Sequence, residues 1–313
     1  MGAINIGRVS KTRPHLLADV AETLCAFELH SYSKTDLLTT IANATKPAEE
    51  SLEFDDLDRD DDGVLDDESQ PKNIQRNQSY VDEGFAQLEF RSKALKGFYP
   101  FDLQTDYISL KRRLNWKHLY YLFLLAASRS RSFGSGRKTQ EIASLFELVC
   151  RDSLRRLMND RASVVMFGPT TKDRREKLSP EWDPNKVKPQ GDGKIDLVGV
   201  QKLDDLGATG WNVFLGQCAA QEDEKSWERK RYESDITYHS SKFHCSVKSQ
   251  SVLFVPSFFR DTNGSWAVND AAAGVILMDR VRILQHLEKN DSSSARVKDF
   301  VQKNGSALLK AYC

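Results

Sequence analysis

The stretch that decides the fold is GDGKIDLVGV, residues 191–200, followed after a short gap by WNVFLGQCAAQ, residues 211–221. Each contains an apolar run with the length of a buried strand. Asp192 and Asp196 stand beside the first run, and the second run ends in the amide Gln217. Because carboxylate and amide oxygens are ligands for hard cations, two such strands side by side predict a metal site.

The residues on either side of this stretch predict a mixed α/β core. A helix is expected over 139–158, with Thr139 as its N-cap. Further strands are expected over 163–167, 249–255 and 274–278, beside those at 194–200 and 212–217. Helices are expected over 222–233, 279–288 and 297–312. The resulting order is helix, three strands, helix, two strands and two helices.

The N-terminal part has a different pattern. Residues 1–45 and 86–133 show helical spacing of apolar residues, whereas 46–85 are acidic and poor in large apolar residues, which predicts a loop. The glycines of Phe133-Gly134-Ser135-Gly136 mark a break. We therefore expect a mainly helical domain over 1–135, containing the acidic loop 46–85, and a second domain over 136–313.

Charge is unevenly distributed along the chain. The 313 residues carry 45 basic and 45 acidic side chains, but the segment 49–68 alone holds twelve acids and one arginine. The rest of the chain has 44 basic and 33 acidic residues, a net charge of +11. This excess permits a partner with a phosphate backbone. Arg280 and Arg282 are candidates to face such a phosphate, with ordinary surface arginines as the alternative interpretation.

Composition also excludes several classes of protein. No apolar run approaches the roughly 18 residues that a membrane-spanning helix needs, so no membrane partner is expected. The five cysteines form no CxxC pair, which favours reduced thiols in the cytoplasm. His239, His244 and Cys245 lack a fourth ligand at zinc spacing.

The acidic segment contains the start of a calcium-loop pattern. Asp58, Asp60, Asp62 and Gly63 match it, but Ser69 stands at position 12, where Glu is required. A solvated acidic loop is the preferred interpretation. Calcium binding remains an alternative, and so does mimicry of DNA by acids that cover a basic groove.

The order helix, strand, GDGKID strand, FLGQC strand and helix resembles the PD-(D/E)xK nuclease superfamily over residues 139–290. It is most similar to type IV restriction enzymes with QxK in place of ExK. The resemblance implies a restriction-endonuclease-like α/β (α+β) fold, in which helices flank a mixed sheet. It also implies Mg²⁺ or Mn²⁺ as cofactor and cleavage of phosphodiester bonds, in DNA in preference to RNA.

Four candidate metal ligands follow from this resemblance. Asp196 falls on the essential aspartate of the family and Gln217 on the acid of ExK. Asp192 precedes Asp196 in the Gly-rich turn. Glu147 lies on the preceding helix, where many members place an extra acid.

The departure from the family pattern is the lysine. The QxK position holds Ala219, which has no ammonium group. In some members the lysine has moved to the following helix, where this chain offers Lys230 as first choice and Lys225 as second. Asp196, Gln217 and one of these lysines would then form the catalytic set.

Two functions remain open. The first is a metal-dependent endonuclease of restriction or antiphage defence, working as an oligomer or with an ATPase or helicase partner protein. The second is a catalytically inactive nuclease-fold subunit that binds or assembles a defence complex. An ammonium within about 4–6 Å of the Asp196 carboxylate, the range of a charge–charge contact, would favour the first.

Overall fold

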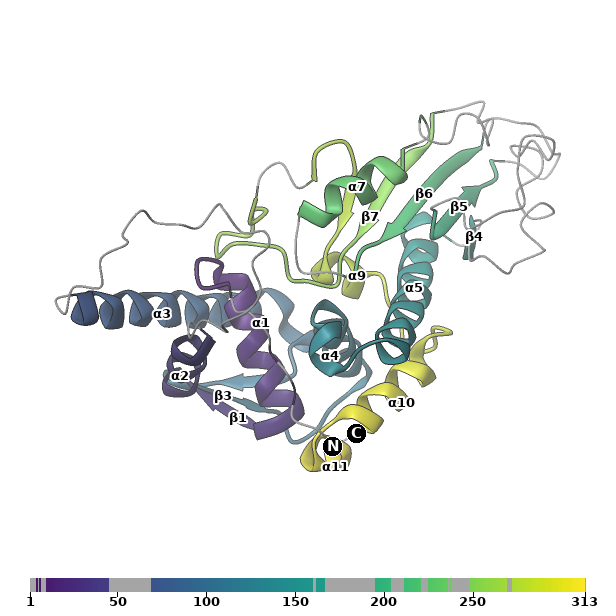
Figure 1. The fold of residues 1–313 in the computed structure, drawn as a ribbon. Helices are drawn as coiled ribbons and strands as arrows, with labels where there is room; N and C mark the ends of the chain where they lie inside the picture. Colours follow the sequence, from purple (N-terminus) through teal and green to yellow (C-terminus); the bar gives the residue numbers. More distant parts are fainter. Residues whose placement is uncertain are drawn as a thin grey trace.

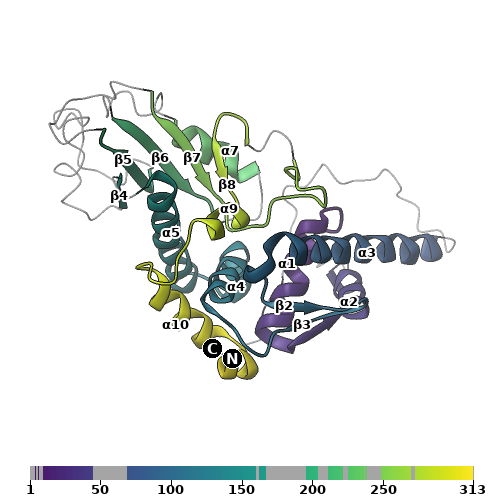
Figure 2. The same ribbon diagram turned by 180° about the vertical axis from the view of Figure 1, so that it is seen from behind.

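The computed structural model describes residues 4, 6, 10–44, 69–159, 162–166, 195–203, 211–220, 225–235, 237, 248–268 and 272–312. Within these ranges, the strands β4 to β8 form one sheet, with α5 and α7 packed on it. A second group of elements contains α1 to α4 and a small sheet (Figures 1 and 2). The helices α10 and α11 return to this second group, and α10 packs against α4.

The described elements have the following bounds. The helices are α1 (Pro14–Leu24), α2 (Lys34–Ala44), α3 (Ser69–Leu95), α4 (Trp116–Ser128), α5 (Arg137–Met158), α7 (Lys225–Glu233), α9 (Arg280–Gln285), α10 (Ser294–Asn304) and α11 (Ala307–Tyr312). Short helical turns are η1 (Cys25–Leu29), η2 (Lys96–Phe98) and η3 (Ser130–Phe133). The strands are β1 (Ser31–Ser33), β2 (Phe101–Leu103), β3 (Tyr107–Leu110), β4 (Ala162–Met166), β5 (Leu197–Gln201), β6 (Asn212–Cys218), β7 (Gln250–Phe254) and β8 (Ile276–Met278).

The larger sheet has the strand order β4-β5-β6-β7-β8. β4, β5 and β6 pair antiparallel, whereas β6, β7 and β8 pair parallel. Alternate residues of β7 face opposite sides: Val252 and Phe254 join the large core with α5, and Leu253 joins a smaller cluster with Trp227 of α7. The mixed α/β fold class, with helices on both faces of a mixed sheet, is confirmed.

The element order predicted for residues 139–312 is also found, with shifted ends. α5 begins at Arg137 after Gly136, so the expected N-cap at Thr139 is wrong. The hydroxyl of Thr139 instead donates to the carbonyl of Gly136 at 3.0 Å. The last predicted helix is divided into α10 and α11 near Gly305, whose added Cβ would lie 2.5 Å from Leu309 Cδ2.

The N-terminal part departs from the expectation in two places. Residues 69–85, expected as part of the acidic loop, belong to the long helix α3. This helix is stable despite its polar composition because Val81, Phe85 and Leu88 are buried against neighbouring elements. The small antiparallel sheet β1-β3-β2 was not predicted, because its strands have only three or four residues.

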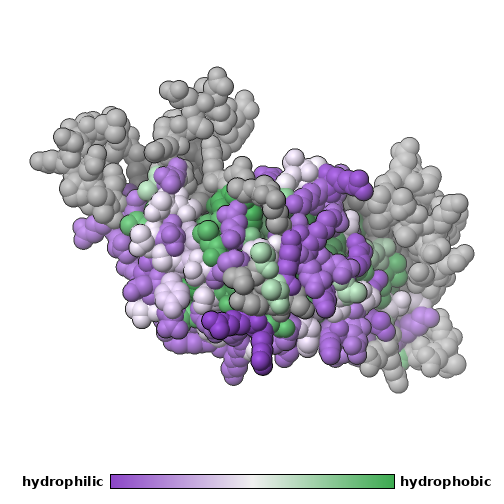
Figure 3. Space-filling model, turned by 90° about the horizontal axis from the view of Figure 1, so that it is seen from below, coloured by the Kyte–Doolittle hydropathy of each residue, from purple (hydrophilic) through white to green (hydrophobic). Residues whose placement is uncertain are grey.

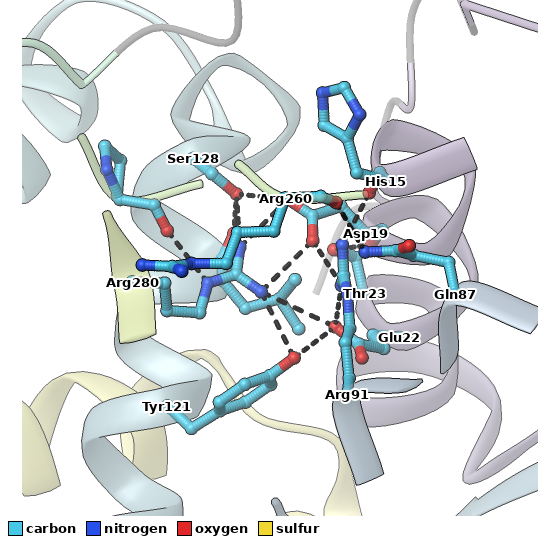
Figure 4. A network of polar contacts seen from close by, with 12 residues as sticks. His15, Asp19, Glu22, Thr23, Gln87, Arg91, Tyr121, Ser128, Arg260 and Arg280 are labelled. Carbon is cyan, nitrogen blue, oxygen red and sulfur yellow. Dashed lines mark hydrogen bonds and ion pairs between the residues drawn. The ribbon is translucent and has the colours of Figure 1, made fainter. Parts of the chain in front are cut away.

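A charge cluster, defined by Asp19, Glu22, Arg91 and Arg280, lies in the interior where α1, α3 and α9 meet (Figure 4). Their side chains are at most 1% exposed. Arg280 donates to both carboxylate oxygens of Asp19, at 2.9 and 3.1 Å, and Arg91 contacts Asp19 at 2.6 Å and Glu22 at 2.8 Å. The expectation that Arg280 faces a phosphate or lies at the surface is therefore wrong.

The buried cores do not follow the predicted boundary at residue 135. One continuous cluster runs from Leu17 through α4 and α5 to Leu309. The division into two domains stays a prediction. No helix among the described residues combines the length and apolarity that crossing a bilayer requires.

Candidate functional site

The antiparallel pairing of β5 and β6 places Asp196 beside Gln217. Leu197 pairs with Gly216, so the residue before β5 stands opposite the residue after Gly216. The N–H of Asp196 donates to the carbonyl of Gly216 at 3.1 Å, one residue out of the register of the ladder, and this bond joins the head of β5 to the end of β6. Directly opposite residues of an antiparallel pair point to the same face. The head of one strand and the end of the next thus present a carboxylate and an amide together.

Lys230 of α7 reaches this pair from the helix that covers the same face. Its Nζ donates to Gln217 Oε1 at 2.9 Å and lies 3.8 Å from Asp196 Oδ2. Gln217 is fully buried, whereas the side chains of Lys230 and Asp196 remain 29% and 14% exposed. Since an ammonium only donates, the contact fixes the amide oxygen of Gln217 toward Lys230. The expected proximity of Lys230 to Asp196 is present.

Packing below α7 explains why Lys230 can reach back. Trp227, one turn before Lys230, is 1% exposed and shares a buried cluster with Ala219. Its ring contacts Phe259 at 4.8 Å between centroids, and Phe259 contacts the ring of His15 at 5.4 Å. The small side chain at 219, where the family pattern has lysine, belongs to the packing that anchors α7. The ammonium that lies beside Gln217 and Asp196 comes from Lys230 of this helix.

Glu147 comes from α5, the helix on the opposite face of the sheet. It is half-buried and has partners within the protein. Burial raises the pKa of Cys218 well above its ordinary value, and the charges of Asp196 and Glu147 raise it further. Both carboxylates therefore act on one thiol at the end of β6. α5 packs on the face of the sheet opposite α7, so Glu147 and Lys230 come from opposite faces.

The other predicted residues are placed less fully. Asp192 lies outside the described residues, as do the acidic segment 49–68 and the residues His239, His244 and Cys245. Lys225 is the first residue of α7, but its side chain is outside the description. Of the two candidate lysines, the structure therefore describes side-chain contacts for Lys230.

Sequence patterns missed one contact at Asp196. The backbone N–H of Cys218 donates to Asp196 Oδ2 at 2.7 Å. This bond holds the carboxylate against the end of β6, and any residue except proline could supply it. No side-chain signal could therefore have revealed it.

The oxygen donors fit Mg²⁺ in type. Mg²⁺ prefers hard oxygen ligands and binds through one or two carboxylates, keeping water and substrate phosphate as further ligands. Asp196, Gln217 and Glu147 offer such oxygens. In the part of the chain that the structure describes, no three His, Cys, Asp or Glu side chains converge as metal ligands. Oxygen donors of this kind suit Mg²⁺ or Mn²⁺, whereas closed zinc sites are built mainly from cysteine and histidine.

Comparison with known proteins adds little. No protein-family model matches the chain, and no curated protein matches it. Among solved structures, the chain is similar to the MspJI restriction endonuclease in complex with a 27-mer oligonucleotide, with a TM-score of 0.28 and 13% identity. The match covers 56% of this chain and 37% of that one.

Proposed function

We propose that this chain hydrolyses phosphodiester bonds of nucleic acid, DNA in preference to RNA, with Asp196, Gln217 and Lys230 as its catalytic set. One observation carries the proposal. Lys230 Nζ lies 2.9 Å from Gln217 Oε1 and 3.8 Å from Asp196 Oδ2, at the junction of two strands. The ammonium that is missing at Ala219 is thereby restored from α7. A polar, partly exposed cation beside a carboxylate and an amide is suited to an anionic substrate.

Each residue has a role in this proposal. Asp196 and Gln217, with Glu147 from α5, would hold Mg²⁺ or Mn²⁺, and Asp192 remains a further proposed ligand. Held by these residues, such an ion would supply a more acidic water and would offset charge on the phosphoryl oxygens. Lys230 orients the attacking water or donates to the oxygen on which charge develops. The Cys218 N–H keeps the Asp196 carboxylate in place during this step.

Purified protein incubated with supercoiled plasmid in Mg²⁺ and in Mn²⁺ tests the proposal. We expect metal-dependent nicking or linearisation that is lost in Asp196→Ala. Lys230→Met should slow cleavage by roughly 10²–10³-fold, the usual cost of one such donor. The matched control is Lys93→Met, whose lysine is 74% exposed and pairs with Glu89 on the surface. Undiminished cleavage by Asp196→Ala would show that the site is wrongly assigned.

Lys225→Met belongs in the same assay, because Lys225 is the alternative donor. We expect its rate to stay within a few-fold of wild type, since the Lys230 contacts remain. A loss in Lys225→Met together with full activity in Lys230→Met would reverse the assignment.

The second candidate is a subunit with the nuclease fold that does not cut. It is favoured by the mutual satisfaction of the polar groups: Lys230 donates to Gln217, and the Cys218 N–H donates to Asp196. Binding of DNA without cleavage in either metal would support this candidate. The proposal also includes a role in restriction or antiphage defence, an oligomeric state and an ATPase or helicase partner. Repeating the same assays with such a partner protein extends the test to these points.

A further inference from the structure

A large open hollow lies away from the candidate site, between the beginning of α5 and α10. Its volume is about 740 Å³, and its walls include Arg137, Lys138, Glu141, Ser144, Arg296 and Lys303. α10 runs antiparallel to α5, since Arg151 of α5 contacts Ser292 just before α10 and Lys303 at its end approaches Glu141. From below, the side on which α10 lies in Figure 1, hydrophilic side chains cover much of the described surface (Figure 3).

The hollow is strongly basic. Four of its side chains are cationic and one, Glu141, is anionic. Glu141 lies 4.0 Å from Lys303, and both are more than half exposed, so this pair neutralises little. Within the described ranges, Arg137, Lys138 and Arg296 have no carboxylate at ion-pair distance. Four cations gathered around a hollow with a single carboxylate favour an anionic partner.

α5 connects this hollow to the candidate site. Ser144 on its wall precedes Glu147 by about one helical turn, so the two share a face of the helix. Arg137 precedes Glu147 by ten residues, a distance of about 15 Å along the axis. That length corresponds to about four base-pair steps of 3.4 Å in duplex DNA. A backbone bound near Glu147 would therefore reach the hollow after about four such steps.

We propose that this hollow is a groove for the nucleic-acid backbone and holds phosphates on one side of the scissile bond. The inference rests on the proposed function. The groove walls carry guanidinium, ammonium and hydroxyl groups and, among the described residues, no aromatic ring. Such groups bind phosphates and set the register of the substrate, whereas aromatic rings would stack on bases. The groove therefore contributes affinity without sequence specificity.

The test is equilibrium binding of a fluorescein-labelled 24-base-pair duplex in EDTA, where no cleavage occurs, between 50 and 200 mM NaCl. The variant is Arg137→Gln with Arg296→Gln. The control is Lys93→Gln with Lys298→Gln, which removes the same charge from exposed lysines outside the hollow, one of them two residues after Arg296 on α10. Thermal melts of both variants verify that they are folded.

We expect the groove variant to lower the slope of log K against log salt by about 0.9 for each phosphate that is no longer neutralised. Affinity at low salt should fall by at least tenfold, with less than a twofold change in the control. Equal binding by groove variant and control would overturn the groove. So would a wild type that does not bind the duplex, or a polyglutamate peptide that binds as tightly and is weakened equally by the groove variant.

The groove and the proposed function fail in different ways. If wild type cuts plasmid but the groove variant binds the duplex normally, the groove is wrong and the nuclease proposal stands. If wild type never cuts but the groove variant loses binding, the groove holds and the second candidate function gains support.

Discussion

The charge cluster and the candidate site both bring carboxylates and cations together, and they do so for different reasons. In the charge cluster, Asp19, Glu22, Arg91 and Arg280 are at most 1% exposed. At the candidate site, one lysine and one aspartate keep 29% and 14% of their side-chain surface in contact with water. Full burial requires every charge to be paired within the protein, whereas partial exposure leaves room for water, metal and substrate.

The charge cluster shifts the pKa values of its two acids in opposite directions. Burial alone would raise the pKa of Asp19, but Arg280 and Arg91 outweigh it and hold the pKa at about 2. At Glu22, burial is the stronger effect and raises the pKa despite the same arginines. The stability contributed by Asp19 is present above its unfolded pKa of about 3.9 and is lost only as pH falls toward 2. At neutral pH the cluster is a structural element.

The largest expected effect comes from breaking that cluster. Arg280→Met leaves Asp19 buried with one arginine fewer and should lower the free energy of unfolding by about 3–5 kcal/mol. Urea denaturation at pH 7 measures it. Arg282→Met is the control, because Arg282 donates to the Leu277 carbonyl and lies over Trp266 without a carboxylate in these contacts. Its cost should be about 1 kcal/mol. Equal costs would contradict the assigned role of the charge cluster.

The next largest effect is a pH dependence at the edge of the cluster. Burial lowers the pKa of His15 to about 4, with Asp19 opposing and Arg91, Arg13 and Arg280 assisting. The unfolded imidazole takes up a proton near pH 6.5, so unfolding binds a proton between pH 6.5 and about 4. The stability from neutral His15 is therefore full above pH 6.5 and lost as pH falls toward 4. The loss is up to about 3 kcal/mol.

The variant His15→Asn separates the contribution of His15 to the pH dependence from that of Glu22. The raised pKa of Glu22 changes the free energy of unfolding in the opposite direction over an overlapping pH range. Unfolding free energies at pH 7, 5.5 and 4.5 should decline less steeply in His15→Asn than in wild type. His286→Asn is the comparison: burial also lowers the pKa of this less buried imidazole, so its removal should flatten the decline in the same direction but by less. An unchanged slope in His15→Asn would mean that this imidazole takes up its proton equally well in the folded chain.

The smallest effect on stability is expected at the site. Lys230→Met should lower the free energy of unfolding by about 1 kcal/mol, because water can replace part of its hydrogen bonding to Gln217. The same urea titration measures it, and the plasmid assay measures the loss of cleavage. A cost as large as that of Arg280→Met would place Lys230 with the structural charges and favour the non-cutting subunit.

Sequence patterns located these two strands to within about three residues because the signals are local. The strands expected over 194–200 and 212–217 run from Leu197 to Gln201 and from Asn212 to Cys218, and their register is seen only in the sheet. The helix after β6 and the position of Lys230 one turn beyond Trp227 are visible in the same way. Weaker local signals gave wrong results: α3 extends through a polar segment, and short strands such as β1 carry almost no pattern.

The sequence by itself determined the mixed α/β class, the order of elements and the residues from which a site could be built. Only the tertiary structure placed Lys230 over Gln217 and Asp196. The sequence gives the spacing of Lys230 from Trp227 along the helix, but the direction in which the Lys230 side chain points depends on how α7 packs around Trp227. It alone decided that Arg280 is buried on Asp19, 261 residues away along the chain. Periodicity reports which side chains are apolar, whereas partners of buried charges are chosen by how distant elements pack.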